Sequence, residues 1–241
     1  MKKLLLLASA VCLLSISSAE AGALNAVYWN FSPSGLPQSA PTSNSFSGLT
    51  VAGFSQNNNN GTTAPFGTTS ASTAYTTAAG FANSGSTNIG AAVLTGTLNT
   101  GTSTYFAFGF SLGSSSTLSY TISDVSFGSR STTTGPQTLS LYASTDGFTS
   151  DFTSLGSITV PNNSAWTAQD FSGLSTLLAN DDSTLSFRIY GSGVVGNPSA
   201  NTATWRIDDV AVTLTEVPEP STVALGIVCG LVGLVAWKRR S

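Results

Sequence analysis

Short stretches of strand length, rich in β-branched and aromatic residues, divide the middle of the chain and constrain its fold more than any other feature. In STLSFRIYG (183–191), Leu185, Phe187 and Ile189 are apolar and the side chains between them are polar or aromatic. Strong helical periodicity is absent from this sequence. The expected strands are Leu24–Phe31, Leu49–Ser55, Ile89–Leu94, Tyr105–Leu112, Leu118–Phe127, Thr138–Ala143, Leu155–Val160, Trp166–Phe171, Leu185–Tyr190 and Thr204–Leu214. They predict an all-β fold, an antiparallel β-sandwich of jelly-roll type.

Two of these stretches share the pattern Ile-x-Asp-Val-x-apolar, at Ile122–Phe127 and Ile207–Val212. In both, the apolar residues change from even to odd positions, or the reverse, in the middle of the strand. Because side chains alternate between the faces of a strand, one inserted residue is needed to keep them on one face. We therefore expect β-bulges near Ser123-Asp124 and Asp208-Asp209, which gives Asp124, Asp208 and Asp209 structural roles. The alternative is a sheet that is buried on both faces.

Two segments depart from the strand pattern. Residues 56–88 are rich in Asn, Thr, Ser, Ala and Gly and lack the apolar side chains that offset the entropy of ordering. They are expected to form a low-complexity surface loop, with at most one short strand near Thr73–Phe81. A ligand-binding loop is the alternative reading of this segment. Ser172–Ala179 is compatible with one or two helical turns.

The start of the chain has the pattern of a secretory signal peptide. Lys2 and Lys3 precede an apolar run, and Ala19-Glu20-Ala21 provides an A-x-A exit. Cleavage is expected after Ala21, with Ala23 as the alternative. The signal peptide would then span residues 1–21, and the β-sandwich domain residues 22–216.

The composition of this domain limits the disulfides it can form and the partners it can bind. Cys12 and Cys229 both lie in the end segments, so no disulfide can join parts of the domain. Arg130, Arg188 and Arg206 are its only cations, and acidic residues outnumber them. A nucleic-acid partner is not expected, because proteins that bind nucleic acids present a basic surface.

The end of the chain combines a charge-free apolar run, Val223–Trp237, with Lys238, Arg239 and Arg240. The sequence VPEP at Val217–Pro220 (Val217, Pro218, Glu219, Pro220) precedes that run. The combination resembles the PEP-CTERM sorting signal of bacterial envelopes, here residues 217–241. The resemblance implies recognition, and cleavage near Pro-Glu-Pro, by an exosortase. A plain membrane anchor that is never cut is the alternative.

This arrangement predicts an itinerary for the chain. The Sec translocon and signal peptidase would export it, and a transmembrane segment of about residues 221–237 would hold it transiently in the inner membrane of a Gram-negative bacterium. The basic tail, residues 238–241, would stay cytoplasmic by the positive-inside rule and act as a membrane stop. After cleavage, the domain would lie on the cell-envelope surface or outside the cell.

The middle of the chain is similar to jelly-roll domains that often precede this tail, and to carbohydrate-binding-module sandwiches. The matching stretches are Val125–Ser150, Leu185–Gly193 and Asn201–Thr213. This resemblance implies the fold and export and identifies no ligand. Together with the sorting signal, it leads us to expect a non-enzymatic surface or extracellular-matrix protein associated with exopolysaccharide or biofilm. The alternative is a carbohydrate-binding module on the cell surface, and an ice-binding or adhesion protein is a weaker one.

Catalysis is not expected, because the domain has no His, Lys or Cys to act as general base or activated nucleophile. The two carboxylates of Asp181-Asp182, and those of Asp208-Asp209, would point to opposite faces of a strand, so neither pair would act together in catalysis. No cofactor is expected. A structural calcium ion held by some of Asp146, Asp151, Asp181 and Asp182 is compatible with the sequence, but no metal ligands are assigned.

Trp166, Arg188 and Arg206 are the candidate ligand contacts. Trp166 lies between two polar segments, whereas Trp205 follows the buried parity of its strand. We expect Arg188 and Arg206 to lie on neighbouring strands and to share the outer face, with one of them pairing with Asp208 or Asp209. Bidentate binding of an acidic polysaccharide by the two arginines is the alternative.

Overall fold

The computed structural model describes residues 25–31, 41, 44–61, 66–68, 72, 75–80, 87–113, 118–179 and 184–217. Within these ranges every element of regular secondary structure is a β-strand, which confirms the all-β prediction. The strands are β1 (Ala26–Trp29), β2 (Leu49–Asn57), β3 (Phe66–Thr68), β4 (Asn88–Ala91), β5 (Tyr105–Leu112), β6 (Ser119–Ser131), β7 (Thr138–Ser144), β8 (Thr153–Thr159), β9 (Trp166–Leu178), β10 (Thr184–Ser192) and β11 (Trp205–Val217).

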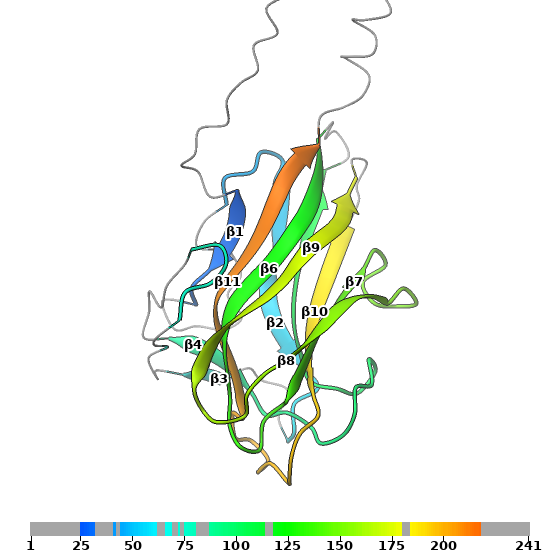
Figure 1. Ribbon diagram of the computed structural model, residues 1–241. Helices are drawn as coiled ribbons and strands as arrows, with labels where there is room; N and C mark the ends of the chain where they lie inside the picture. Colours follow the sequence, from blue (N-terminus) through cyan, green and yellow to red (C-terminus); the bar gives the residue numbers. More distant parts are fainter. Residues whose placement is uncertain are drawn as a thin grey trace, which may run out of the picture.

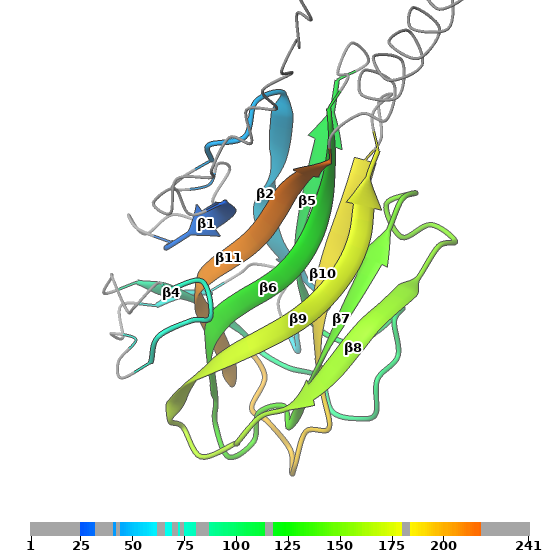
Figure 2. The same cartoon turned by 45° about the horizontal axis from the view of Figure 1, so that its top comes forward.

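The strands of this described part form two antiparallel sheets, consistent with a β-sandwich. The six-stranded sheet has the order β3-β4-β11-β6-β9, with β1 also paired to β11. The five-stranded sheet has the order β2-β5-β10-β7-β8. Figure 1 shows β11, β6 and β9 crossing the front, with β2 and β10 behind them, and Figure 2 shows the same two layers tilted. Between β5 and β11 the chain repeatedly changes sheet, as it does in jelly-roll-like folds.

The core lies between the two sheets and is rich in aromatic side chains. Trp29, Phe106 and Phe187 are completely buried. The ring of Phe108 stacks on Phe187 with 5.2 Å between centroids, and Trp29 lies 5.7 Å from Phe108. Burying one such side chain contributes about 1.5–3 kcal/mol, and a domain without disulfides depends on this contribution.

Both expected β-bulges are present. The register between β11 and β6 shifts between Asp208 and Ala211, and Asp209 has a φ of 49°. The register between β6 and β11 also shifts between Asp124 and Ile122, which are opposite Thr213 and Leu214, so Ser123 is the extra residue in β6. The register between β6 and β9 shifts at the same place, between Ile122 and Asp124. The bulge at Asp208-Asp209 lies where the strand that pairs with β11 on the side away from β6 changes from β4 to β1. The inserted residue restores the inward direction of the apolar side chains that follow it.

The expectation of a helical turn at Ser172–Ala179 is wrong. Strand β9 continues through this segment to Leu178, which pairs with Tyr120 and is buried. Gly173 has a φ of 69°, and this left-handed residue lies beside the shift in register with β6. Pairing with β6 and burial of Leu178 therefore override a local sequence that has little strand character.

The low-complexity segment 56–88 is partly buried, contrary to the expectation of a surface loop. The short strand of this segment is β3, at Phe66–Thr68. Among the described residues of Thr73–Phe81, where a strand was predicted, only Thr76 forms an isolated β-bridge. Tyr75 is buried against the outer face of β6, where a Cβ on Gly128 would come within 2.1 Å of its ring. The segment therefore covers part of the six-stranded sheet.

The predicted end segments lie outside the described residues, apart from Val217, the last residue of β11. This applies to the cleavage residues Ala19 and Ala21, to Pro218, Glu219 and Pro220, and to the membrane stop at Lys238, Arg239 and Arg240. In the part of the chain that is described, no helix has the length and apolar character needed to cross a membrane.

Candidate functional site

A hollow of about 230 Å³ lies on the outer face of the five-stranded sheet, and Arg188 lines it. Strand β10 presents Phe187 and Ile189 to the core, so that Arg188 points outward beside Ala107 of β5. Small side chains form much of the lining. We call this the Arg188 groove; besides Arg188 and Tyr105 it is lined by Ala52, Ser55, Ala107, Gly109, Phe148 and Ser186.

The Arg188 guanidinium lies between two aromatic rings. Its Cζ is 4.2 Å from the ring centroid of Tyr105 and 4.1 Å from that of Phe148. Its Nη1 donates a hydrogen bond of 3.2 Å to the hydroxyl of Tyr190. Stacking on both faces fixes the plane of the guanidinium and leaves its edge for hydrogen bonds.

The Tyr190 hydroxyl links this cation to the backbone. It donates a hydrogen bond of 3.0 Å to the carbonyl oxygen of Thr100. Burial raises the pKa of Tyr190, although the neighbouring Arg188 opposes the increase. The phenol therefore stays protonated and keeps Arg188 in place. Tyr105 and Tyr142 contact the edge of its ring, with centroids 5.3 and 5.6 Å away.

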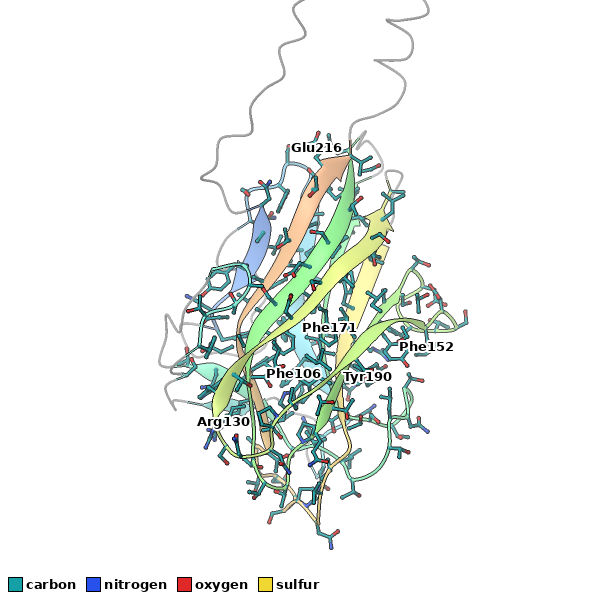
Figure 3. All side chains as sticks on the ribbon, in the orientation of Figure 1. Phe106, Arg130, Phe152, Phe171, Tyr190 and Glu216 are labelled. Atoms are coloured by element: carbon teal, nitrogen blue, oxygen red, sulfur yellow. The ribbon has the colours of Figure 1, made fainter. Side chains whose placement is uncertain are left out.

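The loop between β7 and β8 brings Phe148 over Arg188. Asp146 organises this loop: its carboxylate accepts hydrogen bonds from the Ser150 hydroxyl at 2.7 Å and from the backbone N–H groups of Thr149 and Ser150. Hydrogen bonds from the hydroxyls of Ser150 and Ser144 lower the pKa of Asp146. Figure 3 shows this loop, marked by Phe152, projecting beyond the two strands.

Phe148 itself has a left-handed backbone, with a φ of 65°. This conformation costs a bulky side chain on the order of 1–3 kcal/mol. The backbone N–H of Phe148 donates a hydrogen bond of 2.7 Å to the Ser144 hydroxyl, which helps to hold the conformation. The loop therefore keeps an unfavourable backbone geometry that places an aromatic ring on the cation.

The other two predicted contacts, Trp166 and Arg206, lie on the opposite sheet. Arg206 of β11 is directly opposite Arg130 of β6, which in turn is opposite Trp166 of β9. Figure 3 shows Arg130 at the lower end of this sheet. Burial lowers the pKa of Arg206, and the positive charge of Arg130 lowers it further. Trp166 is half-buried and stacks on Tyr75 with 5.7 Å between ring centroids.

The expectation that Arg188 and Arg206 lie on neighbouring strands is wrong. Strand β10 belongs to the five-stranded sheet and β11 to the six-stranded sheet, so the two arginines face opposite sides of the sandwich. Most consecutive strands of this fold change sheet instead of pairing, which the sequence pattern does not reveal. Arg188 therefore cannot pair with Asp208 or Asp209.

Asp208 and Asp209 are completely buried and interact with hydroxyl groups of distant segments. Ser72 donates a hydrogen bond to Asp208, and Tyr28 and Tyr75 both donate to Asp209, Tyr75 at 2.8 Å. Burial raises the pKa of Asp208 to about 7, and the charge of Asp209 contributes to the increase. These contacts fasten β1 and the segment around Tyr75 to the bulge.

Asp146 and Asp151, two of the four residues considered for calcium, serve the β7–β8 loop. Asp151 accepts a hydrogen bond of 3.1 Å from the backbone N–H of Thr145. Asp181 and Asp182 lie outside the described residues. Among the residues that are described, no three His, Cys, Asp or Glu side chains come together to hold a metal.

Sequence reasoning missed Tyr105 and Phe148 as parts of this site. Tyr105 has the outward parity of its strand, so the alternation that exposes Arg188 could have found it. No sequence signal indicates Phe148, because its position depends on the loop held by Asp146.

Comparisons with known proteins give likenesses of fold. No protein-family model matches the chain, and no curated protein matches it significantly. A solved structure described as CBM4 is 19% identical over 54% of this chain and 70% of its own, with a TM-score of 0.31. The K2 cleaved adhesin domain of Lys-gingipain is 12% identical over 78% of this chain and 97% of its own, with a TM-score of 0.35. The Podospora anserina GH26-CBM35 β-(1,4)-mannanase is 14% identical over 66% of this chain and 28% of its own, with a TM-score of 0.31.

Proposed function

We propose that this chain is an exported, non-enzymatic surface protein whose β-sandwich binds an acidic glycan in the Arg188 groove. The observation that carries the proposal is the position of the Arg188 guanidinium, between Tyr105 and Phe148 at the edge of a hollow. Among the described residues no carboxylate pairs with this cation; its described hydrogen bond goes to Tyr190. A cation placed in this way can accept a carboxylate or sulfate group from outside.

The groove has the parts that recognition of an acidic sugar requires. Arginine binds a carboxylate through two parallel hydrogen bonds, and its fixed plane here reduces the entropy lost on binding. Ala107 and Gly109 keep the floor of the groove low enough for a sugar ring. Ser186 and Ser55 can form hydrogen bonds with hydroxyl groups. A few polar groups beside aromatic rings are typical of a small-ligand site.

Export and sorting are supported by the ends of the sequence. The pattern at 1–21 indicates secretion, and VPEP followed by an apolar run and Lys-Arg-Arg resembles an exosortase substrate. The domain reaches this signal directly, because β11 ends at Val217. After cleavage the domain would associate with exopolysaccharide, which is a partner that fits an acid-binding groove.

A second surface also has the residue types for glycan contact. Trp166, Arg130 and Arg206 form one row across three strands of the six-stranded sheet. Like charges on adjacent strands repel one another, and an anion lying across the row would relieve this repulsion. This row is the alternative location of the glycan site.

Binding measurements with variants on the two faces test the proposal. Pull-down with a polyuronate, compared with a neutral glucan, should show binding that Arg188→Gln reduces at least tenfold, because a bidentate charged contact is lost. Trp166→Ala and Arg206→Gln are the matched controls on the opposite sheet. The alternative location is favoured if these two variants lose binding and Arg188→Gln keeps it. If no glycan on an array is bound, a purely structural matrix role replaces the proposal.

A further inference from the structure

Four oxygen-bearing side chains occupy neighbouring positions on the outer face of β6 and β9. Asp124 is directly opposite Ser172, and Ser126 is directly opposite Asp170. Positions that are opposite or diagonal on adjacent strands lie close enough for their side chains to interact. The block therefore places two carboxyl groups beside two hydroxyl groups, next to the bulge at Ser123.

The two carboxyl groups interact strongly. Burial raises the pKa of Asp124 to about 7, and hydrogen bonding to Asp170 together with the charge of Asp170 adds to the increase. The two carboxyl groups therefore lie close together, at a position that disfavours two negative charges. The three arginines of the domain lie elsewhere: Arg188 on the other sheet, and Arg130 and Arg206 in the row near Trp166.

Two oxygen atoms in the block have no described partner. Oδ1 of Asp124 and Oγ of Ser126 are both buried without a hydrogen bond. Ser126 is completely buried, yet its hydroxyl is near enough to Asp124 to lower the pKa of that carboxyl group. A buried polar atom without a partner is destabilising, so these two atoms favour a ligand at this position.

We propose that Asp124, Asp170 and Ser126 hold a divalent cation, Ca²⁺, on the outer face of the six-stranded sheet. All the available donors are oxygens, which suits Ca²⁺ and disfavours Zn²⁺ or Cu²⁺. Ca²⁺ also accepts irregular geometry completed by water, whereas Mg²⁺ requires a near-ideal octahedron. Two carboxylates predict weak binding, with a Kd of about 10⁻⁴–10⁻³ M, as in other extracellular modules.

The proposed ion would fasten the edge strand β9 to β6. The register between these strands shifts between Ile122 and Asp124, and the ladder is interrupted there. An ion that bridges Asp124 and Asp170 connects the strands at that interruption. This inference is independent of the Arg188 groove, which lies on the opposite sheet.

Calorimetric titration of the full chain with Ca²⁺ at about pH 8, above the pKa of Asp124, tests the site. Ca²⁺ should bind and raise the unfolding temperature by several degrees at ten times the Kd. Asp124→Asn and Asp170→Asn should each raise the Kd at least tenfold. Glu216→Gln, which changes an exposed acid at the end of β11, should leave the response unchanged.

The calcium-free variants separate loss of the ligand from loss of the fold. Asp170→Asn removes the repulsion between the carboxylates, so in calcium-free buffer it should unfold at or above the temperature of the unchanged protein. The proposal is wrong if Ca²⁺ gives no heat of binding, or if both aspartate variants keep the full response. An equal effect of Mg²⁺ would also overturn it, since general screening by divalent ions would then explain the result.

Discussion

The buried carboxyl group of Asp208 should make the protein less stable as the pH rises. Its pKa in the folded state is about 7, against an ordinary value of 3.8, so between these values the folded protein holds a proton that the unfolded chain has lost. The free energy of unfolding should therefore fall by about 1.4 kcal/mol per pH unit across this window. Over the window the loss amounts to about 4 kcal/mol.

Asp208→Asn should remove the contribution of Asp208 to this dependence, because the amide is neutral throughout. The amide oxygen can still accept the hydrogen bond from the Asp209 N–H, and the amide NH2 group can donate a hydrogen bond to the Ser72 hydroxyl. Urea unfolding followed by tryptophan fluorescence, at about pH 4.5, 5.5, 6.5 and 7.5, measures the slope. Asp124 contributes to the same trend, so the variant should reduce the slope without abolishing it.

One outcome of comparing the unchanged protein with Asp208→Asn would contradict this prediction. If the unchanged protein and Asp208→Asn lose stability with equal slopes between about pH 4.5 and 7.5, Asp208 is already ionised in the folded state. The reasoning from burial would then be refuted. Glu216→Gln serves as the control, since an exposed carboxyl group should not alter the slope.

Three further predictions follow from particular residues. Gly128→Ala should lower the free energy of unfolding by about 1–3 kcal/mol, because its Cβ would come 2.1 Å from the ring of Tyr75; thermal unfolding measures this, and an unchanged midpoint would contradict the packing. Asp146→Asn should weaken polyuronate binding while the unfolding midpoint changes little, because it loosens the loop above the Arg188 groove; unchanged binding in a pull-down would count against that role. Intact-mass measurement of envelope and culture fractions should find a mature chain that lacks Met1–Ala21 and the region after about Pro220, whereas a retained C-terminal segment would favour a permanent anchor.

The strands could be predicted from the sequence because their signal is local. Side chains alternate between the two faces of any strand, so the apolar pattern marks a strand wherever it pairs. Tyr105–Leu112 was expected as a strand and is β5 with the same bounds. The bulges at Ser123-Asp124 and Asp208-Asp209 were predictable for the same reason, since each interrupts the alternation within one strand.

The pairing of the strands was harder to predict from the sequence. The sequence placed Arg188 and Arg206 on consecutive strands, but pairing depends on strands far apart in the chain, and β10 and β11 entered different sheets. Likewise, Ser172–Ala179 became a strand because β6 offered it backbone hydrogen bonds. Serine- and threonine-rich segments have no strong periodicity of their own, so their neighbours decide their conformation.

The sequence by itself determined that Arg188 points away from the core, because Phe187 and Ile189 on either side of it must be buried. Only the tertiary structure decided what surrounds that cation. Phe148 reaches it from a loop that Asp146 holds in a left-handed backbone conformation, and Tyr105 reaches it from the neighbouring strand. A site made in this way depends on distances between segments that are remote in the chain, and the packing of the two sheets sets those distances.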